Sequence, residues 1–186
     1  MSLLASGIAL WIGIHLIPSL GIEFKQALVA RIGLTIYRIL FALGILSAMA
    51  MIVLGWQSAQ PTSIYIPPFE LRWVTVVLGI LAFVLLGSTF RPSRIGRVLR
   101  YPQLSAVVLW AFAHLLANGD SRSLVLFPGL ATWALLMMWV MSRRDGPWIK
   151  PEAPALWIDI AAALTMILVA LGVIVIHPQL TGMPVF

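Results

Sequence analysis

Six apolar runs, each close to the length of a helix that crosses a bilayer, constrain this chain more than any other feature. They cover residues 3–20, 39–56, 73–90, 102–117, 124–141 and 156–176. A membrane-spanning helix needs about 20 mainly apolar residues. The chain is 61% hydrophobic and 10% charged, so it has more apolar surface than a soluble fold of its length can bury. The sequence therefore predicts an all-α integral membrane protein: a bundle of about six transmembrane helices, one domain over residues 1–186, surrounded by lipid.

The connections between the runs alternate sharply in Lys and Arg. Ten of the twelve basic residues lie in the first, third and fifth connections: Lys25, Arg31, Arg38, Arg91, Arg94, Arg97, Arg100, Arg143, Arg144 and Lys150. By the positive-inside rule these connections are cytoplasmic, so we expect both termini on the other side (N-out/C-out). Omitting the fourth run, which is the shortest, would break this alternation. The basic residues behind the net charge of +6 lie between apolar runs, where they set orientation, and we expect no nucleic-acid partner.

The first connection, residues 21–38, is too polar to span a membrane but carries apolar residues among Lys25, Arg31 and Arg38. This pattern predicts a helix that lies along the membrane interface between the first two spans. The first run has no basic segment before it and no cleavage site after it, so we expect it to be retained as a helix. The chain has no cysteine, which excludes disulfides, thiolate-held clusters and thioether-attached haem.

Histidines are the only good metal ligands that the apolar runs offer, because the six acidic residues lie in loops or near run ends. His15 lies in the first run, His114 in the fourth and His177 at the end of the sixth, which puts His177 at the outer rim. At about 1.5 Å per residue, His15 lies roughly 18 Å below the start of its run and His114 roughly 18 Å above the cytoplasmic start of its own. In a core about 30 Å thick the two depths differ by roughly 6 Å. An axial pair on one haem is allowed by this arrangement, and so is a plain interhelical hydrogen bond at each histidine.

Several motifs, in their order and spacing, resemble the bacterial NnrU family over most of the chain. They are GIHLIP in the first run, YRILFALGILS from Tyr37, SRIGRVLRYPQL before the fourth run, and AHLLANGD within it. The resemblance implies a protein of the bacterial inner membrane linked to nitrite and nitric oxide metabolism in denitrifying bacteria. It also implies a relation to the plant cis-zeta-carotene isomerase, which binds haem b. Carried over by motif, the haem iron would be bound by His15 and His114.

The resemblance leaves the activity open. Where the family pattern often reads Arg-His-Pro, this chain has Tyr101 between Arg100 and Pro102. One alternative is a haem-dependent isomerase that acts on a cis double bond of a polyene, with a carotenoid or another apolar small molecule as substrate. A second is a small membrane methyltransferase, which shares the Arg-His-Pro pattern, although Tyr101 argues against it. A third is a non-enzymatic accessory protein that carries or senses haem.

Overall fold

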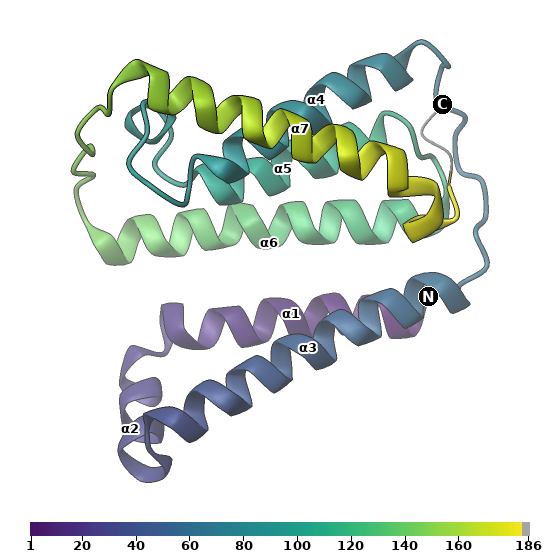
Figure 1. The fold of residues 1–186 in the computed structure, drawn as a ribbon. Coiled ribbons are helices and arrows are strands. Elements are labelled where there is room, and N and C mark those ends of the chain that lie inside the picture. Colours follow the sequence, from purple (N-terminus) through teal and green to yellow (C-terminus); the bar gives the residue numbers. More distant parts are fainter. Residues whose placement is uncertain (184–186) are drawn as a thin grey trace. The chain divides into compact units, whose positions relative to one another are not determined.

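The computed structural model describes residues 1–183, and within them the chain forms seven α-helices and one short 3₁₀ segment (Figure 1). The helices are α1 (Ser2–Leu20), α2 (Ile22–Ile32), α3 (Leu34–Ser58), α4 (Leu71–Gly87), α5 (Pro102–Leu115), α6 (Ser121–Asp145) and α7 (Leu156–Thr181); the 3₁₀ segment is η1 (Ile95–Arg97). No β-strand occurs in this described part of the chain. The prediction of an all-α protein is therefore confirmed.

The chain divides into two compact units whose segments alternate along the sequence. Unit 1 consists of Met1–Ile64 and Asp120–Gly146, and unit 2 of Tyr65–Gly119 and the chain from Pro147 onward. In unit 1, α1 packs against α3 and α6, and α2 turns the chain between α1 and α3. In unit 2, α4 packs against both α5 and α7. The expectation of one domain over residues 1–186 stays a prediction.

Four helices in the described residues are long and apolar enough to cross a membrane: α1, α3, α6 and α7. The other apolar helices are shorter, with 17 residues in α4 and 14 in α5. Large aliphatic side chains lie exposed along α3 and α7, for example Leu46 and Leu54 on the first and Leu168 and Val175 on the second. Such faces are stable in lipid and not in water, so the chain is a multi-pass membrane protein. The count of six spans and the N-out/C-out orientation stay predictions.

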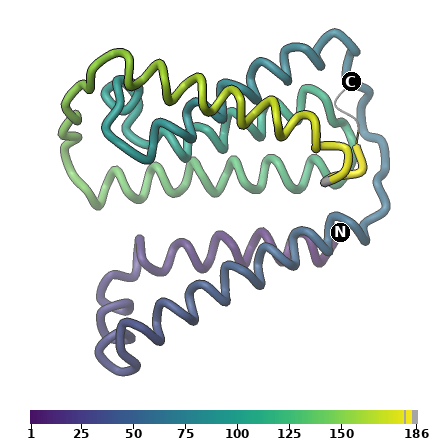
Figure 2. The backbone as a smooth tube through the Cα atoms, viewed as in Figure 1, coloured from purple at the N-terminus to yellow at the C-terminus, as the bar shows by residue number. Residues whose placement is uncertain are grey.

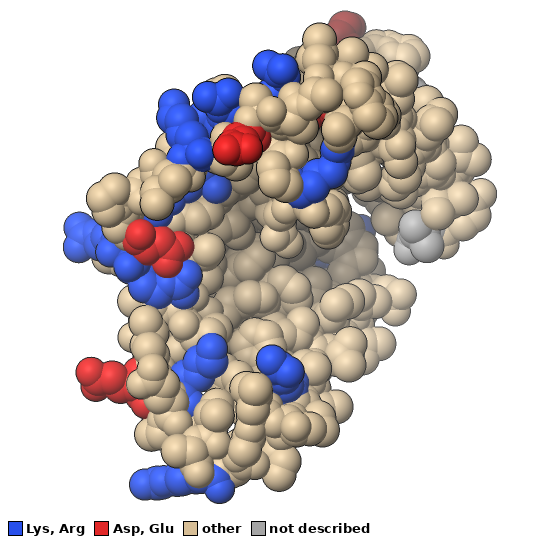
Figure 3. Space-filling model, turned by 60° about the vertical axis from the view of Figure 1, so that its left-hand side comes forward, with Lys and Arg blue, Asp and Glu red and all other residues tan. Residues whose placement is uncertain are grey.

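Contacts between connections agree with the predicted alternation of sides. In unit 1, the backbone N–H of Thr62 donates to Ser121 Oγ, which joins the second connection to the start of α6 after the fourth. In unit 2, the Arg94 guanidinium lies 3.6 Å from the Asp159 carboxylate, which joins the third connection to the start of α7 after the fifth. The second connection thus meets the end of the fourth, and the third meets the end of the fifth. In the view of Figure 3, Lys and Arg side chains gather on parts of the surface, and other large areas carry no charged side chain.

Small residues let α1 and α3 approach closely in unit 1. A Cβ added at Gly55 would overlap the backbone nitrogen of Leu4, and one added at Gly7 would lie 2.8 Å from the backbone nitrogen of Ile52. Figure 2 shows the two backbones converging toward the end where α1 begins. Within a membrane, close backbone approach supplies the packing energy that the hydrophobic effect cannot. These glycines therefore hold the α1–α3 pair together.

Asp120 caps the N-terminus of α6. Its carboxylate accepts hydrogen bonds from the backbone N–H groups of Arg122 (2.9 Å) and Ser123 (3.2 Å) and from Ser123 Oγ (2.6 Å). Burial acts to raise the pKa of the Asp120 carboxyl, but these hydrogen bonds and the Arg122 charge outweigh it and hold that pKa below its usual value. Asn118 and Gly119, just before it, end α5: the Asn118 backbone N–H donates to the His114 carbonyl over 2.8 Å. The Asn-Gly-Asp sequence is thus a helix stop followed by a helix cap.

Candidate functional site

His114 lies in the last turn of α5, in unit 2, and its ring orientation is fixed by the residue one turn earlier. Its Nδ1 is 2.8 Å from the carbonyl oxygen of Trp110, and its ring packs on the Trp110 indole with 4.6 Å between the ring centres. A carbonyl can only accept a hydrogen bond, so Nδ1 carries the proton and Nε2 carries the lone pair. This is the tautomer that a metal-binding histidine needs, with the second nitrogen held by a backbone acceptor.

His15 on α1, in unit 1, repeats this local arrangement. Its Nδ1 lies 2.8 Å from the carbonyl of Trp11, and the two rings are 4.5 Å apart. Trp133 of α6 packs edge-on against the same imidazole at 4.9 Å. The shared feature is a Trp four residues before the His, which one turn of helix places on the same face. This spacing is readable in the sequence as WIGIH and WAFAH, although neither motif by itself indicates a site.

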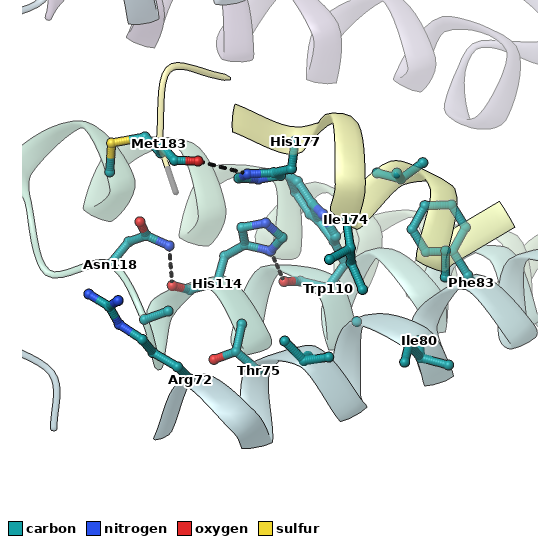
Figure 4. A pocket seen from close by; sticks show the side chains of 15 residues that line it. Arg72, Thr75, Ile80, Phe83, Trp110, His114, Asn118, Ile174, His177 and Met183 are labelled. Carbon is teal, nitrogen blue, oxygen red and sulfur yellow. Dashed lines mark hydrogen bonds between the residues drawn. The ribbon is translucent and has the colours of Figure 1, made fainter. Parts of the chain in front are cut away.

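A cavity of about 240 Å³ opens beside His114 and lies wholly within unit 2, between α4, α5 and α7 (Figure 4). Its walls are mostly apolar, with Val76, Ile80, Phe83, Ala170, Val173 and Ile174 among the lining residues. A Cβ at Gly79, which also lines it, would meet nothing within 4 Å. Arg72, Asn118 and Met183 lie together at one end of the cavity, and Phe83 lies at the other. The cavity therefore has a polar end and an apolar end.

His177 of α7 lines the same cavity, and its ring centre is 6.4 Å from that of His114. Its Nδ1 is 3.1 Å from the Met183 carbonyl oxygen and 3.3 Å from Thr181 Oγ1. The sequence placed His177 at the outer rim and did not predict His114 as its neighbour. The two meet because His114 lies in the last turn of α5 and His177 lies near the end of α7.

The structure assigns the two histidines of the sequence-based pair to different units, His15 to unit 1 and His114 to unit 2. Their joint ligation of a haem iron stays a prediction. Two further polar residues that sequence reasoning did not select support the His114 end of the cavity. Asn118 Nδ2 donates to the His114 carbonyl over 2.8 Å, and the Tyr65 hydroxyl donates to the Asn118 carbonyl over 3.0 Å.

The donor set at this cavity suits a metal that brings most of its own ligands. Among the described residues there is no group of three or more His, Cys, Asp or Glu side chains that could hold a metal ion. A bare ion would find two histidines at this cavity, and the Arg72 charge would oppose it. Haem iron takes four nitrogens from its macrocycle and needs only axial ligands from the protein. Apolar walls, histidine Nε2 atoms and an arginine for the carboxylates fit that group.

Cavities for drug-sized ligands enclose roughly 300–1,000 Å³, so this one is small for a whole macrocycle. A haem held here would keep part of its ring outside the enclosed volume, which measures about 240 Å³.

The family model described as NnrU protein matches residues 3–185, nearly the whole chain. No curated protein and no solved structure matches the chain.

Proposed function

Because the chain belongs to the NnrU family, we propose that it is a haem b-binding protein of the bacterial inner membrane that serves nitrite and nitric oxide metabolism. The observation that carries the haem proposal is the state of His114. Its Nδ1 is tied to the Trp110 carbonyl at 2.8 Å, and its ring borders an apolar cavity with an arginine at one end. The family resemblance supplies the link to nitrogen oxides.

In this proposal His114 binds the iron through Nε2. The Trp110 carbonyl holds the Nδ1 proton and so keeps Nε2 unprotonated, and contact with the tilted Trp110 indole keeps the imidazole from rotating. The apolar walls exclude water from the metal, which favours retention of the cofactor. When bound, haem supplies one-electron chemistry and an iron centre that can bind diatomic gases.

The experiment is an absorption spectrum of protein purified in detergent from cells with ample haem. We expect a Soret band, and a pyridine haemochrome of the b type. His114→Ala should lose or change this spectrum, whereas Phe112→Ala, a change on the same helix at a side chain that is 55% exposed, should not. Circular dichroism checks that both variants remain helical. A wild-type protein without a Soret band contradicts the proposal.

Further tests distinguish a role in nitrogen oxide metabolism from the two enzymatic alternatives, the isomerase and the methyltransferase. Neighbouring genes for nitrite and nitric oxide reduction would support the proposal, and genes for carotenoid desaturases would favour the isomerase. Conversion of a cis polyene by the haem-loaded protein would establish isomerase activity directly. Bound S-adenosylmethionine in the purified protein would favour the methyltransferase.

A further inference from the structure

His114 and His177 stand at the separation that two axial ligands of one metal require. Metal–imidazole bonds are about 2 Å long, so two imidazoles on opposite sides of one ion have ring centres roughly 6 Å apart. The rings of His114 and His177 are 6.4 Å apart and tilted by 35°. Figure 4 shows the His114 ring directed toward the His177 ring across the cavity.

Both rings are also held in the same tautomer. The Met183 carbonyl can only accept, so Nδ1 of His177 is the protonated nitrogen, as Nδ1 of His114 is on the Trp110 carbonyl. The lone pair is therefore on Nε2 in each ring. If the two imidazoles formed a hydrogen bond to each other, one Nε2 would have to carry a proton and donate it. Two rings that both have an unprotonated Nε2 are instead suited to bind a metal.

We propose that His177 is the second axial ligand, so that the iron is held between α5 and α7 within unit 2, by His114 and His177. This inference rests on the proposed function, since it names the ligand pair of the same haem. It differs from the pair predicted by motif, in which His15 takes the second position.

Arg72 gives the cofactor its orientation. It lies in the first turn of α4 and at the same end of the cavity as Asn118 and Met183. In the described part of the chain no Asp or Glu lies within ion-pair distance of its guanidinium. Haem b carries two carboxylates on one edge, and arginine binds carboxylates through paired hydrogen bonds. Arg72 therefore binds a propionate, and the apolar edge of the macrocycle points toward Phe83.

Spectra of single variants test the ligand pair. Wild type is expected to be six-coordinate and low-spin. His177→Ala should be five-coordinate and high-spin, and added imidazole should restore the low-spin spectrum, which a merely misfolded variant would not show. His15→Ala should keep the low-spin spectrum. Val175→Ala, which changes a lipid-facing side chain on α7 that is 73% exposed, is the matched control.

Each outcome has one meaning. A wild-type protein without haem refutes the proposed function and this inference together. A haem-loaded wild type that is five-coordinate, or a His177→Ala variant that stays low-spin, overturns the inference and leaves the proposed function standing. Loss of the low-spin state in His15→Ala but not in His177→Ala establishes the other pair.

The role of Arg72 is tested by haem retention. Arg72→Gln should keep the low-spin spectrum but lose haem to excess apomyoglobin roughly tenfold faster, the size expected for a hydrogen bond to a charged group. Arg72→Lys should recover part of this difference. Equal rates of haem loss in wild type and Arg72→Gln would show that Arg72 does not hold a propionate.

Discussion

Replacing Gly55 with alanine tests the close approach of α1 and α3. The new Cβ would lie 2.6 Å from the Leu4 Cα and would overlap the Leu4 backbone nitrogen. Optimal carbon–carbon contacts are about 3.5–4.0 Å, so the two backbones must separate by roughly 1 Å. The obstacle is backbone and cannot rotate away, so the cost belongs at the upper end of the roughly 1–3 kcal/mol range for overpacking.

Alanine also stabilises a helix by about 1 kcal/mol relative to glycine, and this gain opposes the cost of overpacking. Gly172 of α7 isolates this term, because a Cβ there would meet nothing within 4 Å. We therefore expect opposite signs: Gly55→Ala destabilises by about 1–2 kcal/mol once the helix term is subtracted, and Gly172→Ala is neutral or stabilising.

The assay is reversible unfolding by SDS in mixed micelles, followed by far-ultraviolet circular dichroism for helix content and by tryptophan fluorescence for packing. The transition of Gly55→Ala should move to lower SDS fraction, and that of Gly172→Ala should stay or move to higher fraction. If both variants unfold at the wild-type midpoint, the α1–α3 packing described above does not stabilise the protein.

Three further predictions concern the α6 cap, the membrane orientation and a third glycine. Asp120→Ala should destabilise by about 0.5–2 kcal/mol at neutral pH through loss of the α6 cap. Since the pKa of the Asp120 carboxyl is lowered by folding, its stabilisation is complete above the ordinary carboxyl pKa and is lost as pH falls through the lowered value. Thermal unfolding at several pH values should therefore show the variant approaching wild type in acid. Because the chain has no cysteine, Ser63→Cys and Arg94→Cys each introduce a single thiol. In intact spheroplasts an impermeant maleimide should label Ser63→Cys, whereas it should label Arg94→Cys only after lysis. The atoms nearest to a Cβ added at Gly87 belong to the flexible Met166 side chain. Gly87→Ala should therefore shift the SDS midpoint less than Gly55→Ala, and Met166→Ala should restore it.

The helices were largely predictable because apolar runs and basic connections are direct consequences of the bilayer. Each of the six runs falls within or largely overlaps one helix, and a helix does occupy the first connection, at Ile22–Ile32. The boundaries were less predictable. α3 begins at Leu34, five residues before the apolar run that starts at residue 39. The intervening segment contains Thr35, Tyr37 and Arg38, so it is helical but too polar to be counted in that run. Apolarity reports depth in the membrane, whereas helicity extends beyond it.

The site was only partly predictable. His114 and its Trp110 acceptor are one helical turn apart, so that arrangement is local and can be read from the sequence. The approach of His177 to His114 depends on where two helices end: α5 stops at Leu115, and α7 continues to Thr181. A depth count from the ends of apolar runs places these residues at different levels. The contribution of Arg72 likewise depends on the packing of α4 against both α5 and α7.

The alternation of the two units along the chain affects how the protein is made. Unit 1 lacks α6 until Asp145 has been synthesised, and the chain of unit 2 through Gly119 is made before that. At roughly 5–20 residues per second, several seconds separate the end of α3 from the end of α6. During this interval α1 and α3 must stay paired without α6, while the Ile8 face of α1 that receives Gly129 of α6 remains open to lipid or to the insertion machinery. A chain arrested after Gly119 has neither unit complete, so α6 and α7 act as the closing steps of assembly.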